Sequence, residues 1–155
     1  MAGKEMSKKY PGMVPKTIGT VRSEIKKSST LDFKNVISEI VIDSRWSEAL
    51  DNIDEFSHII VLYWMHQLKT KQVPIKVRPM GTQGLELKGV LATRSPNRPN
   101  PIGKTTVRLL QRQGNVLKVR GLDAIDGSPV IDIKPYIPGY DSTARAKVPP
   151  WVSKR

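Results

Sequence analysis

The segment 58–66, His-Ile-Ile-Val-Leu-Tyr-Trp-Met-His, constrains the fold more than any other stretch, because it is the most apolar run of the chain. β-Branched and aromatic residues dominate it, and these residue types favour strands. Side chains alternate between the two faces of a strand. One face would therefore carry His58, Ile60, Leu62, Trp64 and His66, and the other Ile59, Val61, Tyr63 and Met65. The segment predicts a buried strand that needs partner strands on both sides.

Several shorter runs of β character supply such partners. They lie at residues 17–22, 36–42, 75–78, 85–93, 105–111, 116–122 and 130–133. Ser44 is a candidate N-cap for a short helix that would continue to Asn52, and Gly114-Asn115 is typical of a hairpin turn. Many short strands with short connections predict an all-β fold, either a barrel or a sandwich, with short helical connections.

Length and composition favour one domain. A chain of 155 residues can bury a substantial core, and the absence of cysteine excludes disulfides and thiolate metal sites. No apolar run reaches membrane-spanning length, and the N-terminus lacks the apolar stretch of a signal peptide. We therefore expect a cytoplasmic protein with no membrane partner. It would consist of a basic N-terminal arm (1–16), one β domain (17–141) and a basic C-terminal tail (142–155), which is either free or a strap across a neighbouring surface.

The charge distribution indicates a polyanionic partner. The formal net charge is +12, and no acidic residue occurs between Leu87 and Leu122. The same stretch holds eight basic residues: Lys88, Arg94, Arg98, Lys104, Arg108, Arg112, Lys118 and Arg120. Such a surface attracts nucleic acid, and RNA is the obvious candidate, although a general solubility charge would give a similar composition.

The stretch 89–103, Gly-Val-Leu-Ala-Thr-Arg-Ser-Pro-Asn-Arg-Pro-Asn-Pro-Ile-Gly, combines arginines with prolines. Pro96, Pro99 and Pro101 restrict their own backbone and that of the residue before each, so this loop should be stiff. Arg94 and Arg98 would then stand in fixed positions among polar neighbours. A rigid set of hydrogen-bond donors suits an anionic or nucleotide-like ligand. The simpler alternative is a surface connection that the prolines merely keep ordered.

This stretch and four other segments resemble the TsaA-like, or TrmO, family of S-adenosylmethionine-dependent tRNA methyltransferases. The other segments are 18–23 (IGTVRS), 56–66 (FSHIIVLYWMH), 77–79 (VRP) and 123–136 (DAIDGSPVIDIKPY), so the resemblance covers roughly residues 17–141. It implies an antiparallel β-barrel and, in the characterised relatives, methylation of N6 of threonylcarbamoyladenosine next to the anticodon. Relatives often carry a Pro-Arg-Gln type sequence after the first strand, where this chain reads EIKKSST at 24–30.

The resemblance also assigns candidate residues to the cofactor S-adenosylmethionine. They are His66, Gln67, Arg94, Ser95, Lys104, Asp123, Asp126, Gly127, Ser128 and Pro129. Arg94 can pair the cofactor carboxylate through a bidentate fork, and Asp123 or Asp126 can accept from its ammonium or ribose. Taken alone, Asp126-Gly127 is more typical of a plain hairpin turn.

Arg94 and Arg98 are the candidate catalytic residues, because a positive field would stabilise a deprotonated acceptor nitrogen. The candidate RNA contacts are Arg98, Asn100, Lys104, Arg108 and Arg120. No metal site is expected, since His58 and His66 would stand roughly 26 Å apart along one strand. His58 reads as structural, and Tyr136 either stacks on a base or packs in the core.

The sequence therefore predicts an S-adenosylmethionine-dependent tRNA methyltransferase, and the resemblance implies a homodimer. Two alternatives stay open at this point: a non-catalytic RNA-binding barrel and a cofactor-sensing module that has lost its acceptor.

Overall fold

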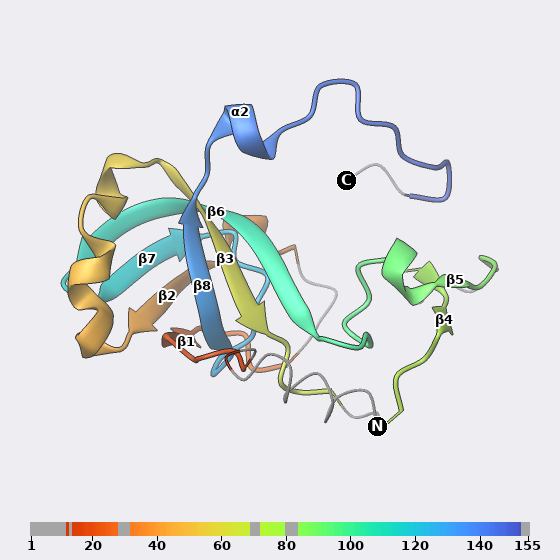
Figure 1. Cartoon of the computed structure of the whole chain (residues 1–155), viewed down its shortest axis with the longest axis horizontal. Coiled ribbons are helices and arrows are strands. Elements are labelled where there is room, and N and C mark those ends of the chain that lie inside the picture. The colour runs from red at the N-terminus through yellow and green to blue at the C-terminus, as the bar shows by residue number, and fades with distance from the viewer. Residues whose placement is uncertain (1–11, 13, 28–31, 69–71, 80–83, 153–155) are drawn as a thin grey trace.

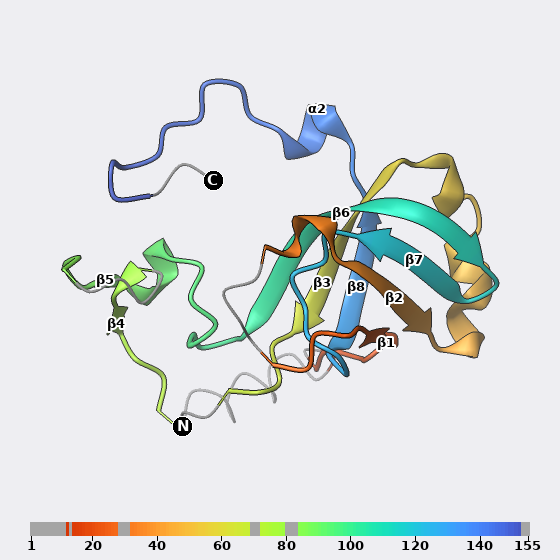
Figure 2. The same cartoon turned by 180° about the vertical axis from the view of Figure 1, so that it is seen from behind.

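The computed structural model describes residues 12, 14–27, 32–68, 72–79 and 84–152. Six strands close into an antiparallel barrel in the order β1-β2-β7-β6-β3-β8 (Figures 1 and 2). They are β1 (Gly19–Arg22), β2 (Ile37–Ile42), β3 (His58–Trp64), β6 (Ile102–Gln113), β7 (Val116–Arg120) and β8 (Pro129–Pro135). The predicted all-β class is confirmed, and the pairing of β1 with β8 makes the fold a barrel rather than a sandwich.

The barrel interior is the hydrophobic core, and β3 contributes to it along its whole length. Ile59, Val61 and Tyr63 are buried in the core cluster, as the predicted alternation of that strand requires. The opposite face of β3 is half-buried except at Ile60, which is 7% exposed. The neighbouring strands complete the interior with Val21, Ile40, Ile42, Val107, Leu117, Val119 and Val130.

An excursion leaves the barrel between β3 and β6 and projects to one side (Figure 1). Its two short strands, β4 (Lys76–Val77) and β5 (Lys88–Gly89), pair only with each other, and the 3-10 helix η5 (Val90–Ala92) follows. The prediction of a strand over 85–93 was therefore wrong in extent. Among the described residues of this segment no third strand extends the pair, and the backbone amide and hydroxyl of Thr93 instead donate to the carbonyl of Val90.

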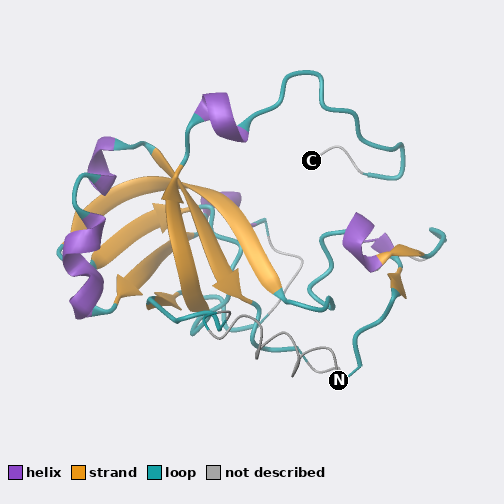
Figure 3. Ribbon diagram, viewed as in Figure 1, coloured by secondary structure: helices purple, strands orange, loops and turns teal. Residues whose placement is uncertain are grey.

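Short helices cover the end of the barrel away from the excursion (Figure 3). They are η2 (Ser44–Leu50) and η3 (Ile53–Glu55), and η1 (Phe33–Asn35) precedes β2. The predicted helix from Ser44 is a 3-10 helix, and its N-cap is Asp43, whose carboxylate accepts from the amide of Arg45 at 3.1 Å. The predicted turn at Gly114 joins β6 to β7, with Gly114 at φ +59°.

The C-terminal segment is extended beyond the short helix α2 (Pro138–Asp141) and reaches the excursion. The ammonium of Lys88 lies 5.8 Å from the ring centroid of Trp151. Of the two possibilities for this segment, the contact favours the strap. Within the described ranges, no helix has the length and apolar character needed to cross a bilayer.

Candidate functional site

Three connections of the barrel meet at one end. They follow β3 (65–68), precede β6 (93–101) and precede β8 (121–128). Because β3 runs antiparallel to both β6 and β8, the end of β3 lies beside the starts of the other two strands. The amide of Met65 donates to the carbonyl of Pro101 at 2.8 Å, which ties the first connection to the second. Three of the segments that resemble the family, 56–66, 89–103 and 123–136, thus meet at this end of the barrel.

His66 lies against the turn at Gly127. His66 was predicted to stand at the end of the apolar strand. Strand β3 ends at Trp64, so His66 instead lies in the connection that follows the strand. A Cβ atom on Gly127 would lie 3.8 Å from Nε2 of His66. Gly127 has φ +78°, which explains the glycine at this turn. The Ser128 hydroxyl is buried and donates to the carbonyl of Ile125 at 2.7 Å, so it stabilises the same turn.

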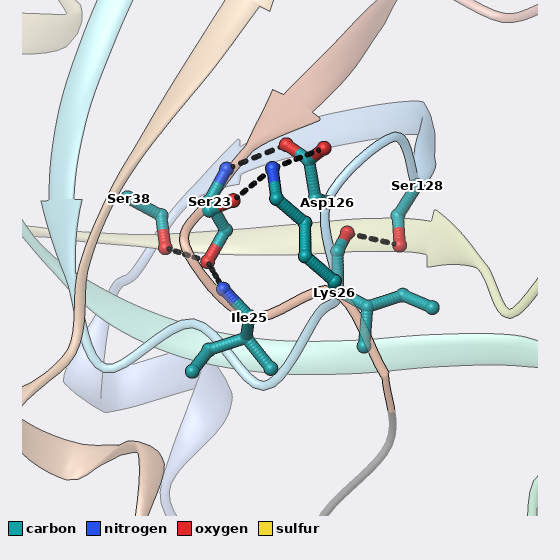
Figure 4. A network of polar contacts seen from close by, with 7 residues as sticks. Ser23, Ile25, Lys26, Ser38, Asp126 and Ser128 are labelled. Atoms are coloured by element: carbon teal, nitrogen blue, oxygen red, sulfur yellow. Dashed lines mark hydrogen bonds and ion pairs between the residues drawn. The ribbon is translucent and has the colours of Figure 1, made fainter.

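The carboxylate of Asp126 fastens this turn to the segment after β1 (Figure 4). Oδ1 accepts from the backbone amide of Ser23 at 2.9 Å, and Oδ2 accepts from the ammonium of Lys26 at 2.8 Å. The bond from Lys26, and then that from Ser23, lower the pKa of Asp126 below its ordinary value. Both oxygens are engaged, so Asp126 holds the two segments together at the edge of the site.

Tyr63 fixes the position of Asp123 from inside the barrel, a role that the sequence did not indicate. Its hydroxyl donates to the backbone carbonyl of Asp123 and lies 3.2 Å from Oγ1 of Thr105. Burial of the ring raises the pKa of Tyr63 to about 12. Gly103 leaves room for this ring, because a Cβ atom there would lie 2.4 Å from two ring carbons of Tyr63. A glycine next to the first residue of a strand was the available signal.

The loop that carries Arg94 is held by its own side chains. Nη1 of Arg98 donates to the carbonyls of Thr93 and Ser95 at 2.9 and 3.3 Å. The hydroxyl of Ser95 accepts from the amide of Asn97 at 3.3 Å, while Arg94 is exposed. Hydrogen bonds to side chains therefore add to the restriction imposed by the prolines, and Arg98 has a positioning role in this loop.

The predicted RNA contacts divide into two groups. Arg98 and Asn100 lie in the loop before β6, whereas Lys104, Arg108 and Arg120 are exposed on the strands β6 and β7. Arg108 and Arg120 are direct cross-strand neighbours, and Nζ of Lys104 donates to Oγ1 of Thr106 at 3.1 Å. Among the predicted cofactor residues, Gln67 is exposed and Pro129 opens β8 opposite Thr20.

A surface depression of about 950 Å³ lies beside these connections. It shares Ser23 and Lys26 with the network around Asp126, and its lining does not include His66, Arg94 or Asp123.

The chain was next compared with known proteins. The family model of the tRNA-methyltransferase O N-terminal domain matches residues 21–142. The chain belongs to this family. An S-adenosyl-L-methionine-binding protein of Archaeoglobus fulgidus is 46% identical over 133 residues, which is 83% of this chain and 93% of that protein. A mouse tRNA (adenine(37)-N6)-methyltransferase is 42% identical over 100 residues, which is 64% of this chain but 23% of the mouse protein.

The fold is also that of a solved TrmO structure. The crystal structure of TrmO from Pseudomonas aeruginosa superposes with a TM-score of 0.70 at 30% identity, over 86% of this chain. The matched part is 59% of that TrmO chain, so this chain spans about three fifths of its length. The barrel expected from the resemblance is thus confirmed within the TrmO family.

Proposed function

We propose that this protein transfers the methyl group of S-adenosylmethionine to N6 of threonylcarbamoyladenosine, next to the anticodon of a tRNA, in the cytoplasm. Membership of the TrmO family and the names of the archaeal and mouse relatives support this proposal. The observation that carries it is the convergence at one barrel end of His66, the Gly127 turn and the rigid arginine loop.

The donor set at this end fits the cofactor. Arg94, an exposed cation on an ordered loop, suits the carboxylate of the methionine moiety. Asp123, whose backbone Tyr63 holds, suits the ammonium or a ribose hydroxyl. His66, Gln67 and the backbone at Gly127 provide further polar groups, and glycine allows a close approach. When bound, the cofactor supplies a methyl group activated by a positively charged sulfur.

The remaining predicted residues shape the site. Asp126 and Ser128 hold the Gly127 turn, while Ser95 and Arg98 hold the loop of Arg94. The chain's task in the reaction is to place the acceptor nitrogen and to stabilise its deprotonated form. A nitrogen flanked by an acyl group loses its proton more readily than an ordinary amine. We assign the stabilisation of that anion to the cations Arg94 and Arg98.

We further propose that the working form is a homodimer in which a second copy covers the excursion. The excursion exposes apolar side chains that the barrel does not cover: Val73 by 49%, Ile75 by 84%, Leu87 by 52% and Leu91 by 73%. Exposed apolar groups gathered on one projecting segment are typical of a protein interface. The loop of Arg94 directly follows η5, so a second copy on the excursion would also lie near this loop.

The test is a methylation assay on two tRNAs that differ only in the threonylcarbamoyl group, followed by mass spectrometry of the nucleosides. We expect a gain of one methyl group on threonylcarbamoyladenosine and none on the unmodified tRNA. Arg94→Ala should abolish the product, and Arg45→Gln, which removes a charge at the other end of the barrel, should retain it. Cofactor binding without transfer to either tRNA would contradict the proposal and favour a cofactor-sensing module.

A further inference from the structure

A row of basic and aromatic side chains crosses the outer face of the barrel away from the cofactor residues. It consists of Arg120 on β7, Arg108 on β6, His58 on β3 and Tyr136 after β8, which we name the basic–aromatic row. The pairing register places Arg108 directly opposite both Arg120 and His58. The backbone amide of Tyr136 donates to the carbonyl of His58 at 3.1 Å, which extends the row across a fourth strand.

The two arginines form an unfavourable pair in the isolated protein. Like charges directly opposite each other on neighbouring strands destabilise a sheet. The ion pairs found among the described residues include neither Arg108 nor Arg120. By contrast, Arg112, four residues further along β6, is bound to Asp51 and to backbone carbonyls. A stability role explains Arg112 but does not explain the facing arginines.

His58 and Tyr136 form an aromatic pair at the other end of the row. Their ring centroids lie 6.4 Å apart at an interplanar angle of 64°, an edge-to-face arrangement. Nδ1 of His58 also lies 2.8 Å from the hydroxyl of Ser57, so the imidazole is held in place. Both residues are half-buried, which leaves part of each ring accessible. Unstacked nucleobases bind to tyrosine, histidine and arginine side chains placed in this way.

The surroundings of the row favour an anion. On the neighbouring strands, the carboxylate of Asp132 pairs with Lys134 at 2.8 Å and that of Glu39 with Arg22 at 3.6 Å. The register of β6 shifts between Leu109 and Gln111, directly after Arg108. Such bulges bend a strand and redirect its side chains, and they recur at functional sites.

From this juxtaposition we propose that the basic–aromatic row is a docking track for single-stranded RNA. Arg108 and Arg120 contact phosphates, and His58 with Tyr136 provides a stacking surface for a base. The proposal deepens the proposed function, on which the identity of the RNA as tRNA rests. Charge complementarity and the accessible parts of the two rings select RNA with unpaired bases, since a duplex would contact the arginines but not the rings.

The experiment measures binding of a short fluorescent oligouridylate by the full chain, without cofactor, over a range of salt concentrations. Loss of a phosphate contact should reduce the slope of log affinity against log salt by about 0.7 for a single strand. We expect this change for Arg108→Gln and for Arg120→Gln, and none for Arg45→Gln. Tyr136→Leu should weaken binding roughly fivefold or more, and Tyr136→Phe should restore it.

A second readout excludes a merely structural role for the arginines. Arg108→Gln removes a like-charge contact, so its melting temperature should equal or exceed that of the wild type. A duplex of the same length should be insensitive to Tyr136→Leu. An unchanged affinity and salt slope in Arg108→Gln/Arg120→Gln would overturn the proposal, as would a Tyr136→Leu protein that binds the oligouridylate like wild type. Because no cofactor is present, failure here is distinguishable from failure of methyl transfer.

Discussion

Replacement of Gly103 by alanine tests whether Tyr63 organises the site from within the barrel. A Cβ atom at this position would lie 2.4 Å from Cε2 and Cζ of Tyr63 and 2.8 Å from its hydroxyl oxygen. Tyr63 is 5% exposed, so its ring cannot move into solvent without leaving the core. Overpacking of this kind costs about 1–3 kcal/mol, and loss of the hydroxyl's bond to the Asp123 carbonyl adds about 0.5–1.5 kcal/mol. We expect Gly103→Ala to destabilise the fold by roughly 2–4 kcal/mol.

Urea unfolding measures this free energy, and Gly139→Ala is the matched control, because nothing lies within 4 Å of a Cβ atom built on Gly139. In a Tyr63→Leu background, which lacks the clashing ring atoms, Gly103→Ala should cost less than about 1 kcal/mol, a coupling that a double-mutant cycle detects. Gly103→Ala should also weaken cofactor binding, since Asp123 loses its anchor. A Gly103→Ala protein as stable as the Gly139→Ala control, or an unchanged cost in the Tyr63→Leu background, would refute this reasoning.

Three further predictions concern individual side chains. Burial raises the pKa of Tyr63 to about 12, so the folded state keeps a proton that the unfolded state loses near pH 10. The contribution of protonated Tyr63 to the free energy of unfolding is therefore fully present below pH 10 and declines by about 1–3 kcal/mol towards pH 12. Chemical unfolding of Tyr63→Phe should show a smaller decline over the same pH range. The lowered pKa of Asp126 has the opposite sign: its stabilisation is present above its ordinary pKa and is lost as the pH falls through the lowered value. The melting temperature of Asp126→Asn should therefore fall less steeply with decreasing pH than that of the wild type. An equally steep fall in the variant would contradict a stabilising role for the hydrogen bonds of Asp126. Arg112 donates to the carbonyls of Gly114, Leu50 and Ser47, so Arg112→Gln should cost about 1–3 kcal/mol in urea unfolding, and a neutral effect would contradict its structural role.

The strands were predictable because their signal is local. Segment 58–66 alternates between a core face and an outer face, and the core face holds Ile59, Val61 and Tyr63 as expected. The excursion was not predictable in the same way. Its residues 85–93 have β character, but only Lys88–Gly89 pair with another strand. The tertiary fold decides which residues lie beside a possible partner strand, and a local sequence pattern does not show this.

The resemblance singled out segments that the barrel brings to one end, whereas the contacts within them could not be predicted. No local pattern indicates that Asp126 binds Ser23 and Lys26, which lie about a hundred residues away along the chain. His58 and Tyr136 were also treated as separate residues with separate roles. The register that places Arg108 between Arg120 and His58 is a property of the closed barrel, so a linear pattern cannot show it.

We propose that Arg94 and its rigid loop bind S-adenosylmethionine, and calorimetric titration of the protein with this cofactor measures that binding. The wild type and the Arg45→Gln control should each show saturable binding. Arg94→Ala should lose at least tenfold in affinity, which corresponds to a charge-assisted bond of about 1.5–3 kcal/mol, while its urea unfolding stays that of the wild type. Absence of saturable binding to the folded wild type, or wild-type affinity in Arg94→Ala, would contradict the account.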